Sequence, residues 1–227
     1  DEGWDDERIT ETSFTSGYES GKTNWILNRP VETISTDENG TLAAKKRNYY
    51  DGNLILGTVS KGNLTRTEDW VEGDRYVASV RNDYDEYGNV VATYDPLYPD
   101  EPGHYRTLVY DDIFHTFPEA EKIHTGDLTL SMTASYDYGL GVMTRSTDFN
   151  GHTTTYDYDT FGRLTSITKP PDTGHTVEYD YVLAYDLGAG KRMNWVETRQ
   201  KDGSADGFLL SRTFHDGPGR KIMTRAE

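Results

Sequence analysis

Hydrophobic and polar residues alternate along most of this chain, in short runs that end at turn-forming residues. Residues 31–36 alternate with period two, residues 37–40 end in Asn-Gly, and residues 42–50 give a return strand. Asn-Gly between two alternating runs is typical of a β-hairpin. The pattern therefore predicts a hairpin over residues 31–50. Further strands are predicted at residues 75–84, 177–183, 195–200 and 208–214.

One strand–turn–strand unit is clearer than the rest and spans residues 156–165. Tyr156 and Tyr158 occupy alternate positions, so they share one face of an extended segment. Asp159 can accept hydrogen bonds from backbone donors of the following turn, and Gly162 can adopt a positive φ that a side chain would resist. This unit predicts a tight turn between two short strands.

Imperfect copies of this unit recur along the chain. Copies open at Tyr84, Tyr110, Tyr136 and Tyr158, which are 26, 26 and 22 residues apart, and the Tyr110 copy has no glycine turn. Units of this length hold two short strands and must stack on their neighbours to bury a face. The positions predicted to define the repeat are Tyr84, Asp85, Gly88, Tyr110, Asp111, Tyr136, Asp137, Gly139, Tyr158, Asp159, Gly162, Arg163, Asp216, Gly219 and Arg220.

The quality of the repeat divides the chain into four expected segments. Residues 1–23 form a polar arm or edge segment, 24–83 degenerate β-hairpins, 84–168 clear repeats, and 169–227 looser hairpins. No amphipathic helix is predicted, although residues 118–122 could form one helical turn. The fold class is therefore all-β, built from antiparallel hairpin repeats.

Composition and charge narrow the function. The 17 tyrosines and 22 glycines suit many short, half-exposed strands with tight turns. A formal net charge of −16 disfavours nucleic acid and anionic membrane surfaces as partners. The absence of cysteine excludes disulfides and thiolate zinc sites, and the absence of a run of about 20 apolar residues predicts no membrane-inserted segment. The acidic opening has no signal peptide, and both ends run out inside patterned sequence, so we expect a mature piece of a longer protein.

Candidate chemistry is weak throughout. The six histidines are scattered without zinc-site spacing, and Asp83 to Gly88 begins like an EF-hand but lacks the later ligands. Gly188 to Lys191 lacks the first glycine and the final Ser/Thr of a phosphate-binding loop. No nucleophile elbow appears, and no carboxylate pair stands out. We expect no catalytic residues, no cofactor and no metal.

Residues 158–164 and 84–90 both fit the pattern Tyr-Asp-x-x-Gly-Arg/Asn-Leu/Val, and residues 148–156 fit the segment that lies between such motifs. This resembles the YD repeat of the RHS family, which includes toxin-complex B components and teneurins. The resemblance implies a long β-sheet that spirals into a hollow shell, enclosing a toxic polypeptide in toxin members and serving adhesion in teneurins. Such shells are several times longer than 227 residues, so the chain would be a strip of wall. The family's self-cleavage segment is not found, because Asp95-Pro96 is followed by Leu97-Tyr98, and no protease residues are carried over.

Three functions follow, in decreasing order of support. The first is a non-catalytic structural module of an exported, bacterial YD-repeat assembly, whose partners are flanking parts of a longer polypeptide or other copies of the chain. The second is a secreted or cell-surface module that binds glycan or protein. Tyrosines that could present a sugar platform, though cross-strand contact explains them more simply, are Tyr156, Tyr158, Tyr179 and Tyr181. An enzyme is the weakest hypothesis.

Overall fold

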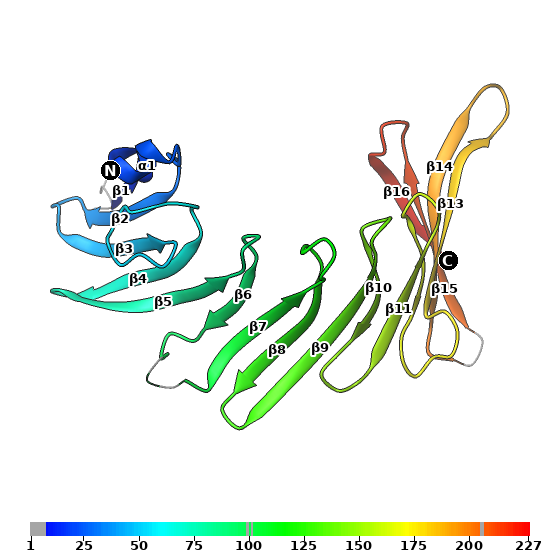
Figure 1. The fold of residues 1–227 in the computed structure, drawn as a ribbon. Helices are drawn as coiled ribbons and strands as arrows, with labels where there is room; N and C mark the ends of the chain where they lie inside the picture. Colours follow the sequence, from blue (N-terminus) through cyan, green and yellow to red (C-terminus); the bar gives the residue numbers. More distant parts are fainter. Residues whose placement is uncertain (1–7, 99, 101, 205–206) are drawn as a thin grey trace. The chain divides into compact units, whose positions relative to one another are not determined.

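The structure is a computed structural model that describes residues 8–98, 100, 102–204 and 207–227 (Figure 1). The chain divides into two compact units, the first ending at Ser131 and the second beginning at Met132. Strands dominate both units, and within each unit neighbouring strands pair antiparallel in the order of the sequence. The predicted all-β class of antiparallel hairpins is therefore confirmed.

The first unit combines strands with one short helical segment. Its strands are β1 (Arg8–Phe14), β2 (Pro30–Asp37), β3 (Leu42–Tyr50), β4 (Leu64–Glu72), β5 (Arg75–Tyr84), β6 (Val90–Tyr94), β7 (His104–Tyr110) and β8 (Pro118–Thr125). A 3₁₀ turn (Thr15–Gly17) and helix α1 (Glu19–Thr23) lie between β1 and β2. Strand β9 (Leu128–Asp137) begins in this unit and ends in the second.

The second unit is a run of hairpins. Its remaining strands are β10 (Val142–Thr147), β11 (Thr153–Tyr158), β12 (Leu164–Thr168), β13 (Val177–Asp186), β14 (Arg192–Lys201), β15 (Phe208–His215) and β16 (Lys221–Ala226). The predicted strands at 177–183, 195–200 and 208–214 lie inside β13, β14 and β15, so these predictions are confirmed. In the first unit the hairpin over 31–50 is β2 and β3, and residues 75–84 are β5.

Two local expectations differ from the structure. The helical turn allowed at residues 118–122 is wrong, because these residues begin β8 and pair with β7 through Ala120 opposite Val109. Proline is tolerated there because it is the first residue of the strand. In the polar opening segment, residues 8–14 form the edge strand β1, Glu19–Thr23 form a helix that was not predicted, and residues 1–7 lie outside the described residues.

The buried side chains are concentrated in the first unit. Val31, Tyr50 and Val59 are at most 3% exposed, and the loop after β3 packs against α1. Asn24 donates from Nδ2 to the Val59 carbonyl at 2.7 Å, and Ser20 donates to the Gly57 carbonyl at 2.9 Å. Among the described residues of the second unit, Ser166, which is 4% exposed, is the only buried one. Its sheet therefore depends on strand-to-strand contacts instead of a thick core.

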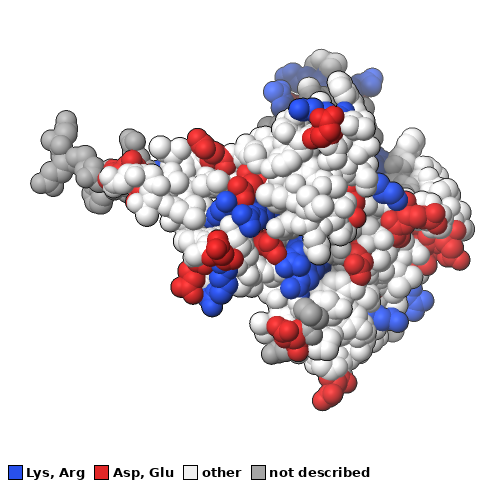
Figure 2. Space-filling view, turned by 60° about the vertical axis from the view of Figure 1, so that its left-hand side comes forward, with Lys and Arg blue, Asp and Glu red and all other residues white. Residues whose placement is uncertain are grey.

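Charged side chains of both signs are interspersed on the face shown in Figure 2. Asp and Glu on that face lie among Lys and Arg and do not form one continuous acidic field. Many of the acidic groups accept hydrogen bonds within turns, which gives them a local structural explanation.

Candidate functional sites: aspartate turns and polar surfaces

Five turns of this chain share one hydrogen-bonding pattern. In each, the aspartate N–H donates to the carbonyl four residues later, and a glycine N–H three residues later donates to the aspartate carbonyl. The carboxylate Oδ1 also accepts the N–H of the residue four positions later, at 2.7–3.0 Å. The turns are Asp37–Thr41, Asp85–Asn89, Asp148–His152, Asp159–Arg163 and Asp216–Arg220. Their glycines have φ of 74° to 91°, where a side chain would be strained.

The Asp159 turn adds an ion pair to this pattern. Oδ1 accepts the N–H of Phe161 at 2.9 Å and of Arg163 at 3.0 Å, while Oδ2 accepts Nε of Arg163 at 2.6 Å. Burial would raise the pKa of Asp159, but the backbone and guanidinium donors of Arg163, with the Phe161 amide, outweigh it and lower the pKa. Asp216 and Arg220 repeat the arrangement, with Nε to Oδ2 at 2.7 Å.

In two longer loops, the aspartate that follows the strand accepts more backbone N–H groups than in the five-residue turns. Asp111 is 1% exposed, and its carboxylate accepts the backbone N–H groups of all five residues from 113 to 117. Burial would raise its pKa, but these donors, Phe117 and Phe114 foremost, hold the pKa far below the usual range. Asp51 likewise accepts four backbone N–H groups, from residues 60 to 63. Each carboxylate therefore organises a long loop around itself.

The copy that opens at Tyr136 departs from the expected glycine position. Asp137 Oδ1 accepts the Leu140 N–H at 3.0 Å, and the Gly141 N–H donates to the Asp137 carbonyl at 2.8 Å. The positive φ falls at Gly141, at 68°, whereas Gly139 does not adopt that conformation. The turn thus closes on the fourth residue after the aspartate instead of the third.

Five tyrosine hydroxyls in the described part of the chain bond to a carbonyl of the preceding strand. Four of the acceptors, Pro30, Leu64, Val90 and Leu164, are the first residues of their strands. The bonds are Tyr50 to Pro30 at 2.7 Å, Tyr84 to Leu64 at 2.9 Å, Tyr110 to Val90 at 3.3 Å, Tyr158 to Met143 at 2.8 Å and Tyr181 to Leu164 at 2.9 Å. The sequence predicted Tyr84, Tyr110 and Tyr158 as repeat positions but missed Tyr50 and Tyr181. The pair Tyr50-Asp51 was a visible signal of the former.

Neighbouring turns also contact one another within the first unit. Asn89 donates from Nδ2 to the His115 carbonyl at 2.6 Å, and the rings of Tyr87 and His115 stack at 3.8 Å between centroids. In the second unit, the guanidinium of Arg163 lies 4.5 Å from the Tyr181 ring centroid. The residue after the turn glycine therefore serves both its own turn and the next repeat.

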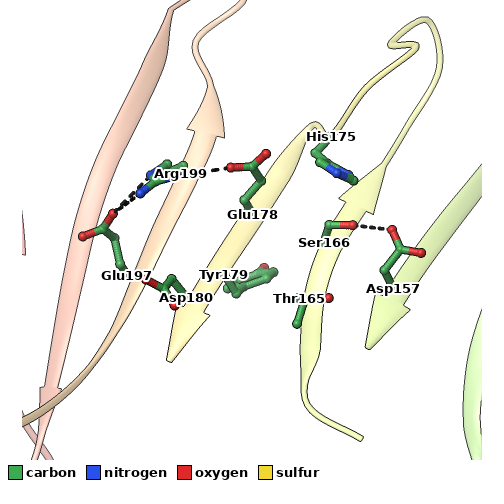
Figure 3. Close-up of a pocket in the computed structure, with 9 residues that line it drawn as sticks. All are labelled: Asp157, Thr165, Ser166, His175, Glu178, Tyr179, Asp180, Glu197 and Arg199. Carbon is green, nitrogen blue, oxygen red and sulfur yellow. Dashed lines mark hydrogen bonds and ion pairs between the residues drawn. The ribbon is translucent and has the colours of Figure 1, made fainter. Parts of the chain in front are cut away.

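A polar cavity of about 400 Å³ opens on the sheet of the second unit (Figure 3). Ser166 donates to Asp157 at 2.5 Å, and Arg199 lies between Glu197 at 2.8 Å and Glu178 at 3.6 Å. Its other lining residues are Thr165, His175, Tyr179 and Asp180. These contacts join β11 to β12 and β13 to β14, so they act as links between strands.

The cavity resembles a catalytic site only in residue type. A serine nucleophile needs an accessible hydroxyl and a base within hydrogen-bond reach. Ser166 is 4% exposed and donates to a carboxylate, and Arg212 and Arg199 lower the pKa of Glu197, which keeps that group ionised. The geometry fits strand pairing better than acid–base chemistry.

Residues 136–174 match the protein-family model described as RHS Repeat. This segment is similar to an RHS repeat. The resemblance to the RHS/YD-repeat family is therefore confirmed, and the matched segment contains the turns that begin at Asp137, Asp148 and Asp159.

No curated protein matches the sequence. A solved structure titled "Crystal Structure of TcdB2-TccC3-TEV" aligns with 97% of this chain at 15% identity and a TM-score of 0.46. This chain spans 14% of that chain. No helix in the described part of the chain is long and apolar enough to cross a membrane.

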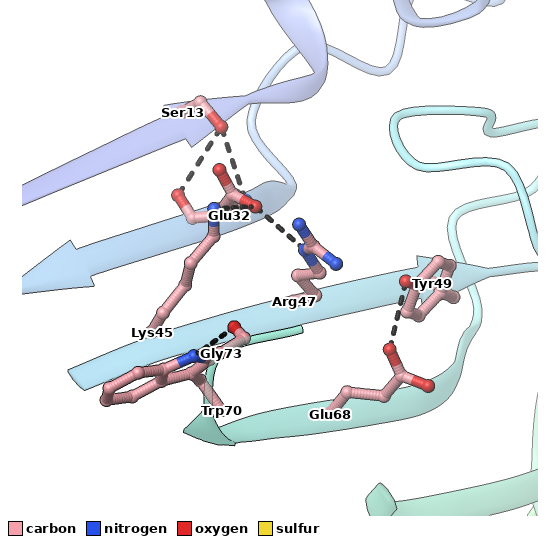
Figure 4. A network of polar contacts seen from close by, with 8 residues as sticks. All are labelled: Ser13, Glu32, Lys45, Arg47, Tyr49, Glu68, Trp70 and Gly73. Atoms are coloured by element: carbon pink, nitrogen blue, oxygen red, sulfur yellow. Dashed lines mark hydrogen bonds and ion pairs between the residues drawn. The ribbon is translucent and has the colours of Figure 1, made fainter. Parts of the chain in front are cut away.

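A second polar network links the first four strands of the chain (Figure 4). Glu32 accepts Nε of Arg47 at 2.9 Å and pairs with Lys45 at 3.0 Å, while Tyr49 donates to Glu68 at 3.0 Å. Burial would raise the pKa of Glu32, but Arg47 and Lys45 outweigh it and lower the pKa. These are cross-strand pairs, the usual stabilising unit of a sheet.

The other chemical candidates from the sequence fall within turns or strand contacts. Asp83 accepts the Tyr94 hydroxyl and Asp85 closes its own turn, so neither is positioned as part of an EF-hand. Gly188 accepts the Lys191 N–H in the turn after β13. Within the described ranges, no group of three or more His, Cys, Asp or Glu residues is arranged to hold a metal ion.

Proposed function

We propose that this chain is a non-catalytic length of wall or scaffold in a larger exported YD-repeat assembly. The RHS repeat and the all-β fold make it a structural repeat module. The observation that carries the proposal is the recurring hydroxyl-to-carbonyl bond, which fastens the strand before an aspartate turn to the strand preceding it. The carboxylates of the aspartate turns and the polar groups of the cavity in the second unit bond within the sheet itself.

The terminal strands supply the means of extension. Strands β1 and β16 are exposed along their whole lengths, and each is paired on one side only among the described residues. Unpaired strand edges bind further strands readily. The proposed partners are therefore flanking parts of a longer YD-repeat polypeptide or other copies of this chain, in a secreted or cell-surface setting.

Strand β16 offers a sharp test. The Glu227 N–H donates inward to the Leu210 carbonyl, so alternate residues, including Thr224, direct their N–H groups away from β15. Thr224→Pro removes an outward donor without breaking the pairing to β15, and Thr224→Val is the matched control. We expect the native chain to assemble, by light scattering after size exclusion, and Thr224→Pro alone to weaken assembly.

Two results would count against the proposal. One is a native chain that stays monomeric at high concentration. The other is assembly that Thr224→Pro and Thr224→Val reduce equally. The intact mass of the native polypeptide, measured beside the assembly mass, separates a subunit that pairs with copies from a segment of a longer chain.

A second function, binding of an external protein or glycan, is favoured by the turn tips. Tyr87 is 56% exposed and Phe161 is 82% exposed, both two residues after a turn aspartate. Exposed aromatic side chains are enriched at surfaces that recognise other molecules. A glycan array and a pull-down with Tyr87→Ala and Phe161→Ala would support this function if binding were detected and then lost.

A further inference from the structure

A row of directly paired residues crosses four strands of the first unit. Tyr49 on β3 is opposite Arg66 on β4, Arg66 is opposite Arg81 on β5, and Arg81 is opposite Tyr94 on β6. Residues that are directly opposite in an antiparallel sheet project from the same face. The row therefore places two arginines side by side, although like charges in that relation repel each other.

Both arginines keep a buried donor that the sheet does not use. Nε of Arg66 and Nη1 of Arg81 are buried and have no hydrogen-bond partner among the described residues. Arg66 pairs with Glu68 through Nη2, and the guanidinium of Arg81 lies 5.9 Å from the Tyr98 ring centroid. Both side chains are nevertheless only partly buried and line one cavity, so the accessible donors of the two guanidinium groups can together bind an oxyanion there.

The neighbouring carboxylates are already engaged. Asp83 accepts the Tyr94 hydroxyl at 2.6 Å, and this bond, together with burial, raises the pKa of Tyr94 to about 12. Glu68 accepts the Tyr49 hydroxyl at 3.0 Å as well as pairing with Arg66. Two carboxylates beside two guanidiniums leave no net charge, so the cluster offers an anion directed guanidinium hydrogen bonds instead of a net positive field.

The arginines line a cavity of about 260 Å³ that has room for one small ring. Its wall includes the Tyr94 and Tyr98 rings, whose centroids are 4.4 Å apart, and the side chain of Asn53. This volume lies just below the range of about 300–1,000 Å³ for small-molecule sites. An acid of monosaccharide size matches the cavity, and tyrosine and asparagine can hydrogen-bond its hydroxyls.

We propose that this cavity binds a small carboxylic acid of monosaccharide size, with the carboxylate held by Arg66 and Arg81. The site is independent of the scaffold role. Its ligand lies on the sheet face, whereas assembly uses the strand edges at β1 and β16. Loss of assembly and loss of ligand binding would therefore be seen as separate failures.

The test uses the full chain and two sugars that differ in one group. Sodium glucuronate and glucose are titrated by calorimetry, while the Nε–H signal of Arg66 is followed by NMR. We expect glucuronate, and not glucose, to bind and to shift that signal. Arg81→Gln should weaken glucuronate binding by about tenfold or more, because a charge-assisted bond is lost. Arg145→Gln, at an exposed arginine on β10, is the matched control and should leave binding unchanged.

Several results would overturn the proposal. These are binding of glucose as tightly as glucuronate, an unmoved Arg66 signal at saturating glucuronate, and equal loss in Arg81→Gln and Arg145→Gln. If Arg81→Gln does not fold, as judged by circular dichroism, Tyr98→Ala replaces it, since Tyr98 lies in the loop after β6 and lines the same cavity. Weakened glucuronate binding in a folded Tyr98→Ala chain supports the site, and unchanged binding contradicts it.

Discussion

The turns at Asp111 and Asp159 hold the same place in the repeat but are built by different means. Asp159 closes a five-residue turn with two backbone donors, the Arg163 guanidinium and a glycine at φ 74°. Asp111 closes a longer turn with five backbone donors, and His115 provides the positive φ, at 53°. The Asp111 carboxylate is nearly inaccessible, whereas the side chain of Asp159 is 22% exposed.

The difference shows which part of the motif is indispensable. The Asp111 turn has neither the glycine nor the arginine of the Asp159 turn. Additional backbone N–H donors to its carboxylate fix the loop in their place. The aspartate and the tyrosine before it persist in both turns, and both tyrosines donate to a backbone carbonyl of the preceding strand. We therefore expect the Asp111 turn to depend on its carboxylate more heavily than the Asp159 turn does.

Removing the two carboxylates should give the largest effect. Asp111→Ala leaves five backbone N–H groups without their acceptor, while Asp159→Ala leaves two. Unsatisfied buried donors are costly, so we expect Asp111→Ala to lower the Tm by roughly 5–10 °C and Asp159→Ala by less than half of that. Calorimetric melting of each full-length variant measures the difference.

Asp112→Ala is the control for this experiment. Asp112 is exposed and follows Asp111 directly, so its loss should change the Tm by no more than about 1 °C. Equal destabilisation by Asp111→Ala and Asp159→Ala would show that the number of backbone donors does not decide the strength of a turn.

The tyrosine hydroxyl should matter alike in the Tyr84 and Tyr158 repeats, with a smaller effect than the carboxylates. Tyr84→Phe removes the bond to the Leu64 carbonyl without altering the ring, and we expect it to lower the free energy of unfolding by about 1 kcal/mol. Tyr158→Phe removes the equivalent bond to Met143 and should cost about the same. Urea unfolding measures both, and Tyr87→Phe, at an exposed turn tip, should be close to neutral. A neutral Tyr84→Phe would contradict the role of the hydroxyl as a fastener between strands.

Hairpins and glycine turns could be predicted because they depend on local signals. Alternation with period two and glycine after aspartate are visible within ten residues, as at residues 156–165. The hydroxyl-to-carbonyl bonds could not be read in the same way, because they join residues 15 to 20 positions apart and need the register of the strands. A bulge beside Tyr84 and another beside Tyr158 shift that register by one residue. The paired arginines Arg66 and Arg81 were missed for the same reason.

Gly162→Ala tests how much the positive φ of the glycine contributes to the stability of the Asp159 turn. Gly162 has φ 74°, and a Cβ there would meet nothing closer than Leu140 Cδ2 at 3.9 Å. The cost of Gly162→Ala is therefore backbone strain alone, about 1 kcal/mol by chemical denaturation. Gly174→Ala has open space and no positive φ, so it should be neutral or slightly stabilising. Equal effects of the two substitutions would mean that the turn tolerates another backbone conformation.

Arg163 should give the smallest effect on stability but a clear one on titration. Its donors help to lower the pKa of Asp159, so Arg163→Gln should raise that pKa toward the ordinary value of about 3.9. An aspartate with a lowered pKa adds stability that is complete above its unfolded value and is lost as pH falls through the folded value. The variant should therefore lose part of the acid dependence that Asp159 contributes, while the pKa of Asp111, which its own turn's backbone donors lower, stays where it is. Carboxyl-carbon NMR titration of both aspartates measures this. An unmoved Asp159 would show that backbone donors alone set its pKa, and the two turns would then differ only in how many such donors they have.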